Sequence, residues 1–550
     1  MGEGALNPWG SGGVRRRRLL FGAAAAACGP LVACRRETAV PGYDGGWVGA
    51  SHDRGHRLRD LAASTLPVPA LQRRAGVLVV GAGVAGLACA RGLTQAGRDD
   101  VHVFDLEDEP GGNSRGHRMG GMDCPLGAHY LPVPGERATD LLGLLEELGL
   151  CRVDQGRHVF DERHLCHSPQ ERLFIDGHWQ EGLLPMWGQG AETLDDYRRF
   201  SAEVAQAQAE AGFSLPTRLT PWTPAHAALD AVTLAQWLDA RSLASPALRT
   251  YLDYCCRDDF GAGTAQVSAW AGLHYFASRH GFRAPGATEP DDHDSVLTWP
   301  EGNAWLTRRM ASPLGDRLHT GMVVLRVTPG RHEVSVDLWN ARDHRSERWT
   351  APQVVIATPL FIAARLLPSP PAALQDAVGR MRHAPWLVAN LQLGEPLDDV
   401  PGAPPSWDNV IHGSPLLGYV DAMHQGTMPY PGPTVLTAYW ALGGDSDAQL
   451  RSQRARLLSQ PWGDWAEAVV RDLAGPHPDL PGKVRRIDLM RYGHAMSIPV
   501  PGVRGSASLA ALIQRRDRVG FAHADLSGYS VFEEAFFHGA ESARQLIALR

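Results

Sequence analysis

The pattern of apolar and polar positions predicts a strand–helix–strand unit within residues 77–105. Val77–Val80 is a short, unbroken apolar run, which is typical of a parallel strand buried on both faces. Residues 86–96 have the character of a helix, and Val101–Phe104 is a second apolar run of strand length. A helix that joins two parallel strands is the βαβ arrangement, so we expect these strands to be neighbours in one sheet.

The same character returns twice more along the chain, after two long segments of different pattern. Residues 135–295 read as mostly helical, with apolar positions at helical spacing among charged ones. Residues 332–338 alternate apolar and polar side chains, and Val354–Ala357 is again uniformly apolar. Residues 376–480 mix strands with proline- and glycine-rich loops, and residues 519–550 read as a strand, a loop and a long helix.

We therefore predict an α/β protein with a discontinuous Rossmann-like dinucleotide-binding domain and an inserted α+β substrate domain. The predicted dinucleotide-binding domain comprises residues 74–135, 296–372 and 505–550, and the predicted substrate domain comprises residues 136–295 and 373–504. Residues 35–73 are rich in glycine, proline, arginine and aspartate and lack a clear period, so we expect a linker with an irregular lead-in.

The N-terminus, residues 1–34, predicts an export signal. Four arginines, Arg15–Arg18, precede an apolar, alanine-rich run that is shorter than the ~20 residues needed to span a bilayer. The arginines resemble a twin-arginine (Tat) signal, and Leu31–Cys34 resembles a bacterial lipobox with Cys34 as the acylated residue. We expect the Tat machinery to export the protein across the bacterial inner membrane and a lipid at Cys34 to anchor it on the periplasmic or cell-surface side. A basic N-terminal tail is the alternative.

Charge and cysteine content narrow the range of partners. The formal net charge of -7 gives no reason to expect nucleic acid as a partner. Cysteines and histidines gather in residues 151–167, but Arg172–Trp179 reads as a hairpin with a type I′ turn, and a surface hairpin with its lead-in explains them better than a metal site. We assign no metal. The basic residues are almost all arginine, with Lys483 as the single lysine.

The strongest chemical signal is the glycine-rich sequence Gly81–Gly86, which follows the first predicted strand and opens the first predicted helix. Gly81 allows a tight turn, Gly83 lets the backbone approach a pyrophosphate, and Gly86 lets the helix pack closely on the sheet. The helix N-terminus then offers free N–H groups and a positive dipole end to the phosphates. Asp105 ends the second strand, where an acid that binds ribose hydroxyls is expected. Together these residues predict a dinucleotide site.

The residues that follow Asp105 resemble the flavin amine oxidase superfamily. In that family a strand-end acid is followed six residues later by a glycine pair that wraps the pyrophosphate and ribityl chain of FAD, and here the pair is Gly111-Gly112. Residues 298–359 and 521–540 are similar to the family's middle and closing blocks. The resemblance therefore implies that the dinucleotide is FAD.

The two later blocks imply three further FAD contacts. The resemblance implies that Val324 meets the adenine through its backbone and that Asp525 contacts the ribityl–phosphate region. It also implies that the backbone N–H of Phe532, at a helix N-terminus, faces a carbonyl of the isoalloxazine ring. A helix N-terminus at that point would stabilise negative charge on the reduced flavin.

Two positions depart from the family pattern. Many relatives carry an arginine directly after the glycine pair; here Asn113 stands there, and Arg115 is the expected substitute on the phosphates. Many relatives also place a lysine against flavin N5, where this sequence aligns Asn390, and Lys483 does not match that position. The resemblance then implies hydride transfer directly from a substrate C–H to N5, with the protein supplying positioning and electrostatics.

Four more residues are candidates for the substrate side of the flavin. His129 and Tyr130 lie in a segment similar to the family strand that reaches the flavin's substrate face. Tyr492 and His494 lie just before the closing block, where relatives carry an aromatic residue beside the ring. A neutral histidine could accept an amine or hydroxyl proton near pH 7. With Asn390, these four are the predicted catalytic residues.

The sequence thus predicts an FAD-dependent oxidoreductase that oxidises a small-molecule amine, or a C–C or C–O bond, and passes electrons to oxygen or another acceptor. A flavin-dependent isomerase or mutase without net redox chemistry is one alternative, because Gly-Gly-Asn113 also resembles flavin-dependent sugar mutases. A non-catalytic, flavin-stabilised binding protein is the other, because the N5 lysine is absent from its aligned position.

Overall fold

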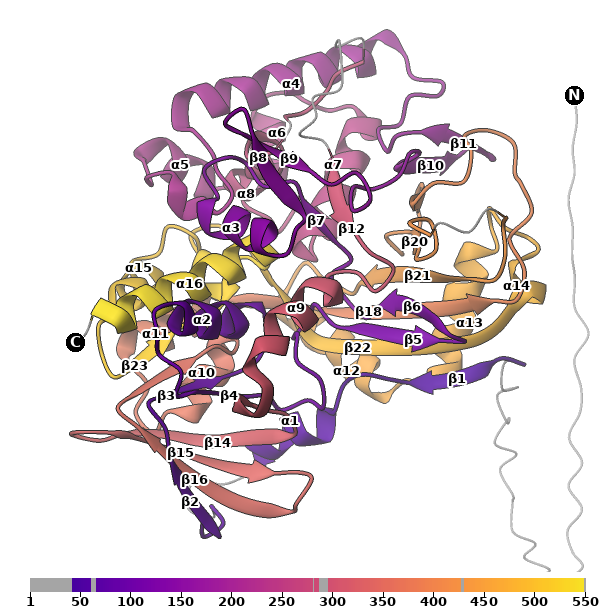
Figure 1. Ribbon diagram of the computed structural model, residues 1–550. Coiled ribbons are helices and arrows are strands. Elements are labelled where there is room, and N and C mark those ends of the chain that lie inside the picture. The colour runs from indigo at the N-terminus through magenta and orange to yellow at the C-terminus, as the bar shows by residue number, and fades with distance from the viewer. Residues whose placement is uncertain (1–41, 61–65, 280, 286–294, 427–429, 549–550) are drawn as a thin grey trace, which may run out of the picture. The chain divides into compact units, whose positions relative to one another are not determined.

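The computed structural model describes residues 42–60, 66–279, 281–285, 295–426 and 430–548 (Figure 1). The predicted export signal, residues 1–34, lies outside these described residues. Among the helices that are described, none combines the length and apolar character needed to cross a membrane.

A five-stranded parallel sheet is built from three distant parts of the chain, and it confirms the α/β class predicted above. Its central strands are uniformly apolar because both faces are covered, one by helices and the other in part by another sheet, whose Trp349 packs on Phe104. In spatial order the strands are β13 (Leu318–His319), β4 (Val101–Phe104), β3 (Val77–Val80), β17 (Gln353–Ile356) and β23 (Val519–Phe521). The same parts of the chain also form the helices α2 (Val84–Gln95), α9 (Ala304–Ala311), α10 (Leu360–Leu366), α11 (Ala372–Arg380), α15 (Ala507–Gln514) and α16 (Phe532–Ala548).

Helices α2 and α16 pack unusually closely, because glycine and alanine stand where they meet. A Cβ atom on Gly539 of α16 would lie only 2.1 Å from the carbonyl oxygen of Ala85 and 2.8 Å from the Cβ of Ala88. A Cβ on Gly92 of α2 would lie 2.9 Å from the Cβ of Ala543. This contact brings the first turns of both helices to the same cavity, described below.

The irregular lead-in predicted for residues 35–73 is wrong for most of the described part of that range. It contains β1 (Asp44–Trp47), α1 (His52–Asp60) and β2 (Leu71–Arg74). Both strands are edge strands: β1 pairs with β22 (Val484–Ile498), and β2 completes a four-stranded sheet with β14 (Met322–Pro329), β15 (Val334–Asn340) and β16 (Arg345–Ala351). Strand β1 has the sequence Asp-Gly-Gly-Trp and β2 has the sequence Leu-Gln-Arg-Arg, so neither shows an apolar period, which is why the sequence pattern missed them.

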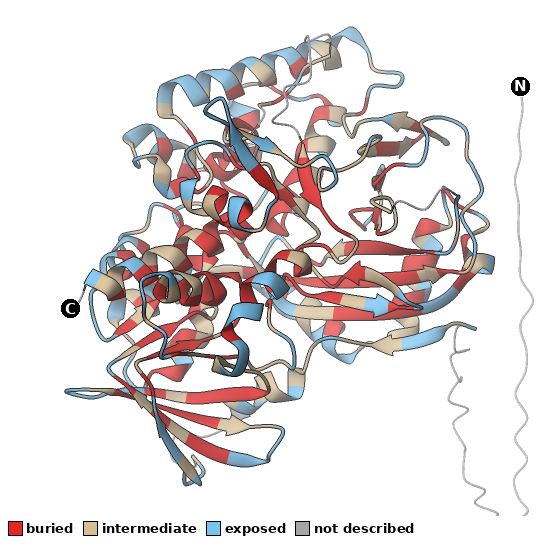
Figure 2. Ribbon diagram, viewed as in Figure 1, coloured by how far each residue is buried: buried red, intermediate tan, exposed pale blue. Residues whose placement is uncertain are grey.

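A second sheet has eight strands. Its strand order is β1, β22, β18 (Arg382–Leu393), β21 (Thr434–Ala441), β20 (Tyr419–Asp421), β19 (Asp408–Ile411), β10 (Glu171–Ile175) and β11 (His178–Glu181). Trp465 and Val469 of α13 (Trp462–Leu473) pack with Leu387 and Leu436 on one face, beside α12 (Asp447–Ser459). Figure 2 shows that the buried residues concentrate in the strands of this sheet and of the parallel sheet.

A helical layer lies over the other face of the eight-stranded sheet (Figure 1). It consists of α4 (Ala191–Ala211), α5 (Pro224–Asp230), α6 (Leu234–Ala240), α7 (Pro246–Phe260) and α8 (Ala269–Ala277). The mostly helical pattern of residues 135–295 is thus confirmed in part, since α3 (Thr139–Glu147) is followed by the strand pairs β8 (Cys151–Asp154), β9 (Arg157–Phe160) and β10, β11. The predicted hairpin is confirmed, with left-handed backbone at Asp176 (φ 50°) and Gly177 (φ 85°).

The α2–α16 contact generates a stability prediction. We expect Gly539→Ala to lower the free energy of unfolding by ~1–3 kcal/mol, because a methyl group there must displace the backbone of α2. Gly143, inside α3, is the matched control: a Cβ there meets nothing within 4 Å, so Gly143→Ala should stabilise by up to ~1 kcal/mol. Thermal unfolding of both variants measures the difference, and equal melting temperatures would contradict the packing described.

Candidate functional site

Three adjoining cavities run from the parallel sheet to the helical layer. The cofactor cavity (about 370 Å³) lies against the glycine-rich turn, the inner cavity (about 150 Å³) lies against β18 and β22, and the outer cavity (about 480 Å³) lies beneath α7 and α8. Asn113, Ala495 and Phe532 line both the cofactor and the inner cavity. Tyr130 and Asp258 line both the inner and the outer cavity. The three cavities therefore adjoin one another in a row, which we call the path.

The floor of the cofactor cavity is the turn between β3 and α2. Gly81 has a φ of 106°, and a Cβ there would lie 2.5 Å from the carbonyl oxygen of Ala357, so only glycine fits. Gly86 is equally restricted, since its Cβ would lie 1.9 Å from the carbonyl oxygen of Gly81. Gly83 differs: the nearest atom to a Cβ is the Cα of Gly112, 3.8 Å away. Gly83 and Gly112 thus lie close together at the start of α2, since a Cβ on Gly112 would lie 3.2 Å from the Cα of Gly83.

This cradle fits the pyrophosphate of a dinucleotide. Helix α2 begins at Val84, and no described side chain caps its N-terminus, so its first N–H groups remain available at the cavity floor. An uncapped helix N-terminus with glycine backbone on both sides is a built anion site. Gly111 and Gly112 close the cradle from the adjoining loop with φ values of 123° and 60°.

Asp105 holds this cradle in shape from the end of β4. Its carboxylate accepts hydrogen bonds from the N–H of Ala82 at 2.7 Å and from the N–H of Glu107 at 2.9 Å. Burial raises the pKa of Asp105 to about 6. Because the carboxylate also lines the cofactor cavity, it can accept hydrogen bonds from ribose hydroxyls, the role that the sequence predicts.

The later blocks of sequence meet the same cavity from the other side. Val324, Asp525 and Phe532 all line it, and α16 begins at Phe532. Asp525 is fully buried; it accepts a hydrogen bond from the N–H of Leu360 at 2.9 Å. Although burial raises its pKa, the neighbouring His523 and His383 hold the pKa of Asp525 well below its usual range. The carboxylate therefore stays ionised.

Arg115 does not take the position expected for a phosphate-binding arginine. Its guanidinium donates to the carbonyl oxygens of Gly112 at 3.1 Å and Gly49 at 2.9 Å, and it does not line the cofactor cavity. Arg115 therefore stabilises the backbone at Gly112. Asn113 does face the cavities, and its Nδ2 donates to the carbonyl oxygen of Ala495 at 2.6 Å.

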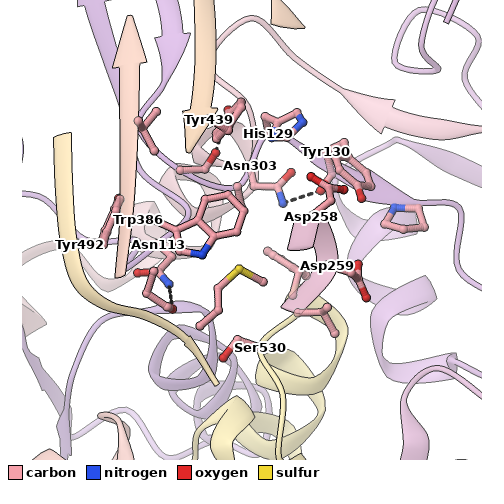
Figure 3. A pocket seen from close by; sticks show the side chains of 18 of the residues that line it. Asn113, His129, Tyr130, Asp258, Asp259, Asn303, Trp386, Tyr439, Tyr492 and Ser530 are labelled. Carbon is pink, nitrogen blue, oxygen red and sulfur yellow. Dashed lines mark hydrogen bonds between the residues drawn. The ribbon is translucent and has the colours of Figure 1, made fainter. Parts of the chain in front are cut away.

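Aromatic side chains wall the inner cavity on the side of the eight-stranded sheet. Figure 3 shows Trp386 and Tyr492 on one side of the cavity and Asp258 and Asp259 on the other. The hydroxyl of Tyr492 donates to the carbonyl oxygen of Leu126 at 2.8 Å, which fixes the ring. His129 and Tyr130 also line this cavity, so the structure brings together three of the five predicted catalytic residues.

Asn390 and His494 lie elsewhere. Asn390 is fully buried, donates to the carbonyl oxygen of Pro125 at 3.0 Å, and accepts from Thr437 at 2.7 Å. The residues of β18 that face the inner cavity are Trp386 and Val388, because alternate residues of a strand share a face and only these two reach the opening. His494 lines the cofactor cavity rather than the inner one.

The histidines are weaker bases than the sequence suggests. Burial lowers the pKa of His129 to about 3, and its ring stacks on Tyr439 with centroids 4.5 Å apart. Burial, with Arg454 nearby, lowers the pKa of His494 to about 3. Both imidazoles are therefore neutral at physiological pH and accept a proton poorly, which argues against a general-base role.

Carboxyl groups that the sequence analysis did not single out line the path instead. Asp258 of α7 lines the inner and outer cavities together with Glu533 of α16, and Glu171 and Asp408 line the outer cavity. Burial, with Asp259 adjacent, raises the pKa of Asp258 to about 7, and burial raises the pKa of Glu533 to about 7. Burial, with Asp258 and Glu171, raises the pKa of Asp408 well above its usual range.

Nothing in the local sequence marks these carboxyl groups. They come from four separate elements, β10, α7, β19 and α16, and only folding brings them together. Asp258-Asp259 on a helix reads as a solvated polar face, and Asp408 stands at the start of a short strand. Helix α7 also carries Arg249, Asp253 and Arg257, so the pair Asp258-Asp259 does not stand out from the other charged residues of the helix.

Comparison with known proteins places the chain in a single family. The family model for flavin containing amine oxidoreductases matches residues 84–547. A putative flavin-containing monoamine oxidase from Mycobacterium tuberculosis is 26% identical over 377 residues, which cover 64% of this chain and 75% of that protein. The family match begins at the first residue of α2, after Gly81 and Gly83, and it includes Asp105, the glycine pair and all residues that line the inner and outer cavities.

Solved structures show the same fold. A putrescine oxidase with putrescine bound superposes with a TM-score of 0.62 at 18% identity, covering 87% of this chain and all of that one. The cyclohexylamine oxidase of Brevibacterium oxydans IH-35A superposes with a TM-score of 0.61 at 20% identity, covering 86% of this chain and all of that one.

Gly83, where a Cβ would make only an ordinary contact with Gly112, generates a test of the cradle. We expect Gly83→Val to fold and yet to lose FAD, because the protein leaves room for the side chain while the pyrophosphate would not. The ratio of flavin to protein absorbance measures retention, and circular dichroism checks folding. Gly482→Val, where a Cβ meets nothing within 4 Å, is the control. A folded Gly83→Val protein that keeps stoichiometric FAD would contradict the assignment.

Proposed function

The chain belongs to the flavin containing amine oxidoreductase family and is an FAD-dependent oxidoreductase, and we propose that its substrate is a di- or polyamine. In this proposal one amino group reacts in the inner cavity while a second, as an ammonium ion, binds the carboxylates of the outer cavity. The observation that carries the proposal is the presence of three carboxyl groups in the lining of the outer cavity, Asp258, Asp408 and Glu533, that have no ion-pair partner among the described residues.

Carboxyl groups outnumber guanidinium groups in the lining of the outer cavity. The carboxyl groups are Glu136, Glu171, Asp258, Asp408 and Glu533, and the guanidinium groups are Arg137 and Arg279. Glu136 already pairs with His158 at 2.6 Å. Arg279 pairs with Asp259 at 3.1 Å, so its charge is already matched within the inner cavity. Among the described residues, no ion pair within 4 Å includes Asp258, Asp408 or Glu533.

Unpaired buried carboxylates are costly, so each of these groups shifts its pKa upward rather than staying charged. A dication that enters the cavity removes this cost because it supplies the missing positive charge. The side chains around the carboxyl groups are aromatic: Tyr130, Tyr254, Tyr275, Trp407 and Tyr439. Aromatic faces attract ammonium ions and pack against the methylene chain between them. This lining supports an alkyl di- or polyamine over a neutral substrate.

Each part of the path has a role in the proposed reaction. Bound FAD, held by the Gly81–Gly86 turn, Asp105 and Asp525, supplies the acceptor for a hydride from the carbon beside the nitrogen. Asp258 accepts a proton from the incoming ammonium, because its pKa of about 7 leaves it partly ionised at neutral pH. Trp386 and Tyr492 orient the reacting carbon and exclude water.

The same charge weighs against the isomerase alternative. A sugar nucleotide carries a negatively charged pyrophosphate, which the carboxyl groups of the outer cavity would repel. A non-catalytic binding protein would have no need for an aromatic passage that continues into the cofactor cavity. Both alternatives therefore fit the cavities less well than amine oxidation.

The outer cavity generates a specificity prediction. We expect Asp408→Asn to lower kcat/KM for 1,4-diaminobutane roughly 30-fold, about 2 kcal/mol, because the second ammonium loses its partner. Oxidation of butylamine, which lacks that ammonium, should be unchanged. Asp195→Asn on the exposed face of α4 is the control. Steady-state kinetics with both amines measures the effect, and an equal loss for both would refute the assignment of Asp408.

The raised pKa values generate a pH prediction. Asp258 and Glu533 are neutral below about pH 7 and charged above it, whereas both ammonium groups of the substrate stay charged across this range. The KM for 1,4-diaminobutane should therefore fall as the pH rises through about 7. The inflection should weaken in Asp258→Asn and disappear in the Asp258→Asn, Glu533→Gln double variant. A profile unchanged by the double substitution would rule out both groups.

A further inference from the structure

A cleft lined by arginines adjoins the cofactor cavity but not the path taken by the amine. It has a volume of about 310 Å³, and four arginines line it: Arg365, Arg382, Arg451 and Arg454. We call it the arginine cleft. It shares no lining residue with the inner or the outer cavity.

One layer of aromatic rings separates the arginine cleft from the cofactor cavity. His383 and His494 line both spaces, and Phe361 lies between them on the side of the cleft. The ring centroids of Phe361 lie 5.1 Å from His383 and 4.7 Å from His494. A molecule in the cleft is therefore separated from the cofactor cavity by the thickness of a single side chain.

The positive charge of the cleft is largely unmatched. Arg382 pairs with Asp447 at 2.5 Å, and Asp447 is the single carboxyl group in the lining. The guanidinium of Arg454 donates to the carbonyl oxygen of Gly493 at 2.9 Å, which fixes its position. Within the described chain, no hydrogen bond or ion pair uses the guanidinium of Arg365 or Arg451. The chain as a whole carries a formal charge of -7, so this concentration of cations is a local feature.

We propose that the arginine cleft binds an anionic electron acceptor, which takes the electrons of the reduced flavin through the aromatic wall. Arg365 and Arg451 attract the anion, and the apolar side chains Val378, Met381 and Leu450 receive the body of an organic acceptor. The cation substrate and the anion acceptor then use separate entrances of opposite charge. The proposal rests on the chain being an FAD oxidoreductase, and it holds for any amine substrate.

The electrons balance for a one-electron acceptor such as ferricyanide. Two ferricyanide ions each accept one electron in the cleft and leave as ferrocyanide. Together they remove the two electrons that came from the oxidised amine, and two protons pass to water. A two-electron organic anion would take both electrons in one encounter.

The test uses the FAD-loaded enzyme with Arg365→Glu and Arg451→Glu combined. Both side chains are exposed, so the fold should tolerate the change. The control variant combines Arg308→Glu and Arg331→Glu, which changes the net charge equally at exposed positions outside the cleft. Enzyme reduced by amine without oxygen is mixed rapidly with ferricyanide or with uncharged benzoquinone at low ionic strength. Ferrocyanide binding to the oxidised enzyme, where no electrons flow, is measured by calorimetry.

We expect the cleft variant to react with ferricyanide at least 10-fold more slowly than the native enzyme and to lose ferrocyanide binding. Its reaction with benzoquinone and its FAD content should match those of the native enzyme, and high salt should remove the ferricyanide difference. An equal loss in the control variant would overturn the proposal. An unchanged ferricyanide rate would also overturn it, whether or not ferrocyanide binding is lost. Oxidation of 1,4-diaminobutane by the same variant tests the proposed amine specificity separately, because the arginine cleft shares no lining residue with the outer cavity.

Discussion

The close approach of three backbone segments at the start of α2 is the constraint on which the site depends. Gly81 and Gly86 let the turn, the helix and the strand end at Ala357 meet at distances that no side chain permits. Asp105 ties the turn to β4 through the N–H of Ala82. This packing leaves the N-terminus of α2 uncapped and open to a pyrophosphate, and Gly539 brings the first turn of α16 to the same space. The cofactor cavity therefore results from backbone contacts.

Acidic and basic side chains lie on different sides of this cavity. Carboxyl groups of α7, β10, β19 and α16 gather along the path that leads to the inner cavity, and burial raises the pKa values of Asp258, Asp408 and Glu533 among them. Arginines of α10, β18 and α12 line a separate cleft behind an aromatic wall. Because like charges repel, each opening selects ligands of the opposite sign. A cation oxidised on one side and an anion reduced on the other would not compete for one binding site.

Strand geometry explains why some site residues were misplaced by sequence comparison. Trp386, Val388 and Asn390 share one face of β18, but the inner cavity opens beside the first two, and Asn390 is used to hold Pro125 and Thr437. Arg115 lies two residues beyond the position where an arginine was expected, and its guanidinium turns away from the cavity to the carbonyls of Gly112 and Gly49. An offset of two residues changes the sequence pattern very little, but it gives the arginine side chain different contact partners.

The sequence by itself determined the dinucleotide cradle, the α/β class and the flavin, because the residues responsible are contiguous or stand at intervals set by one strand, one turn and one helix. Gly81, Gly83, Gly86, Asp105 and Gly111-Gly112 need no distant partner to be recognised. Only the tertiary structure revealed the carboxyl groups of the outer cavity and the arginine cleft. Asp258 and Asp408 are 150 residues apart, and the pKa of Asp408 depends on burial and on Asp258, so no local pattern indicates it. Local geometry is set by neighbouring residues, whereas the electrostatics of a cavity depends on which distant residues surround it.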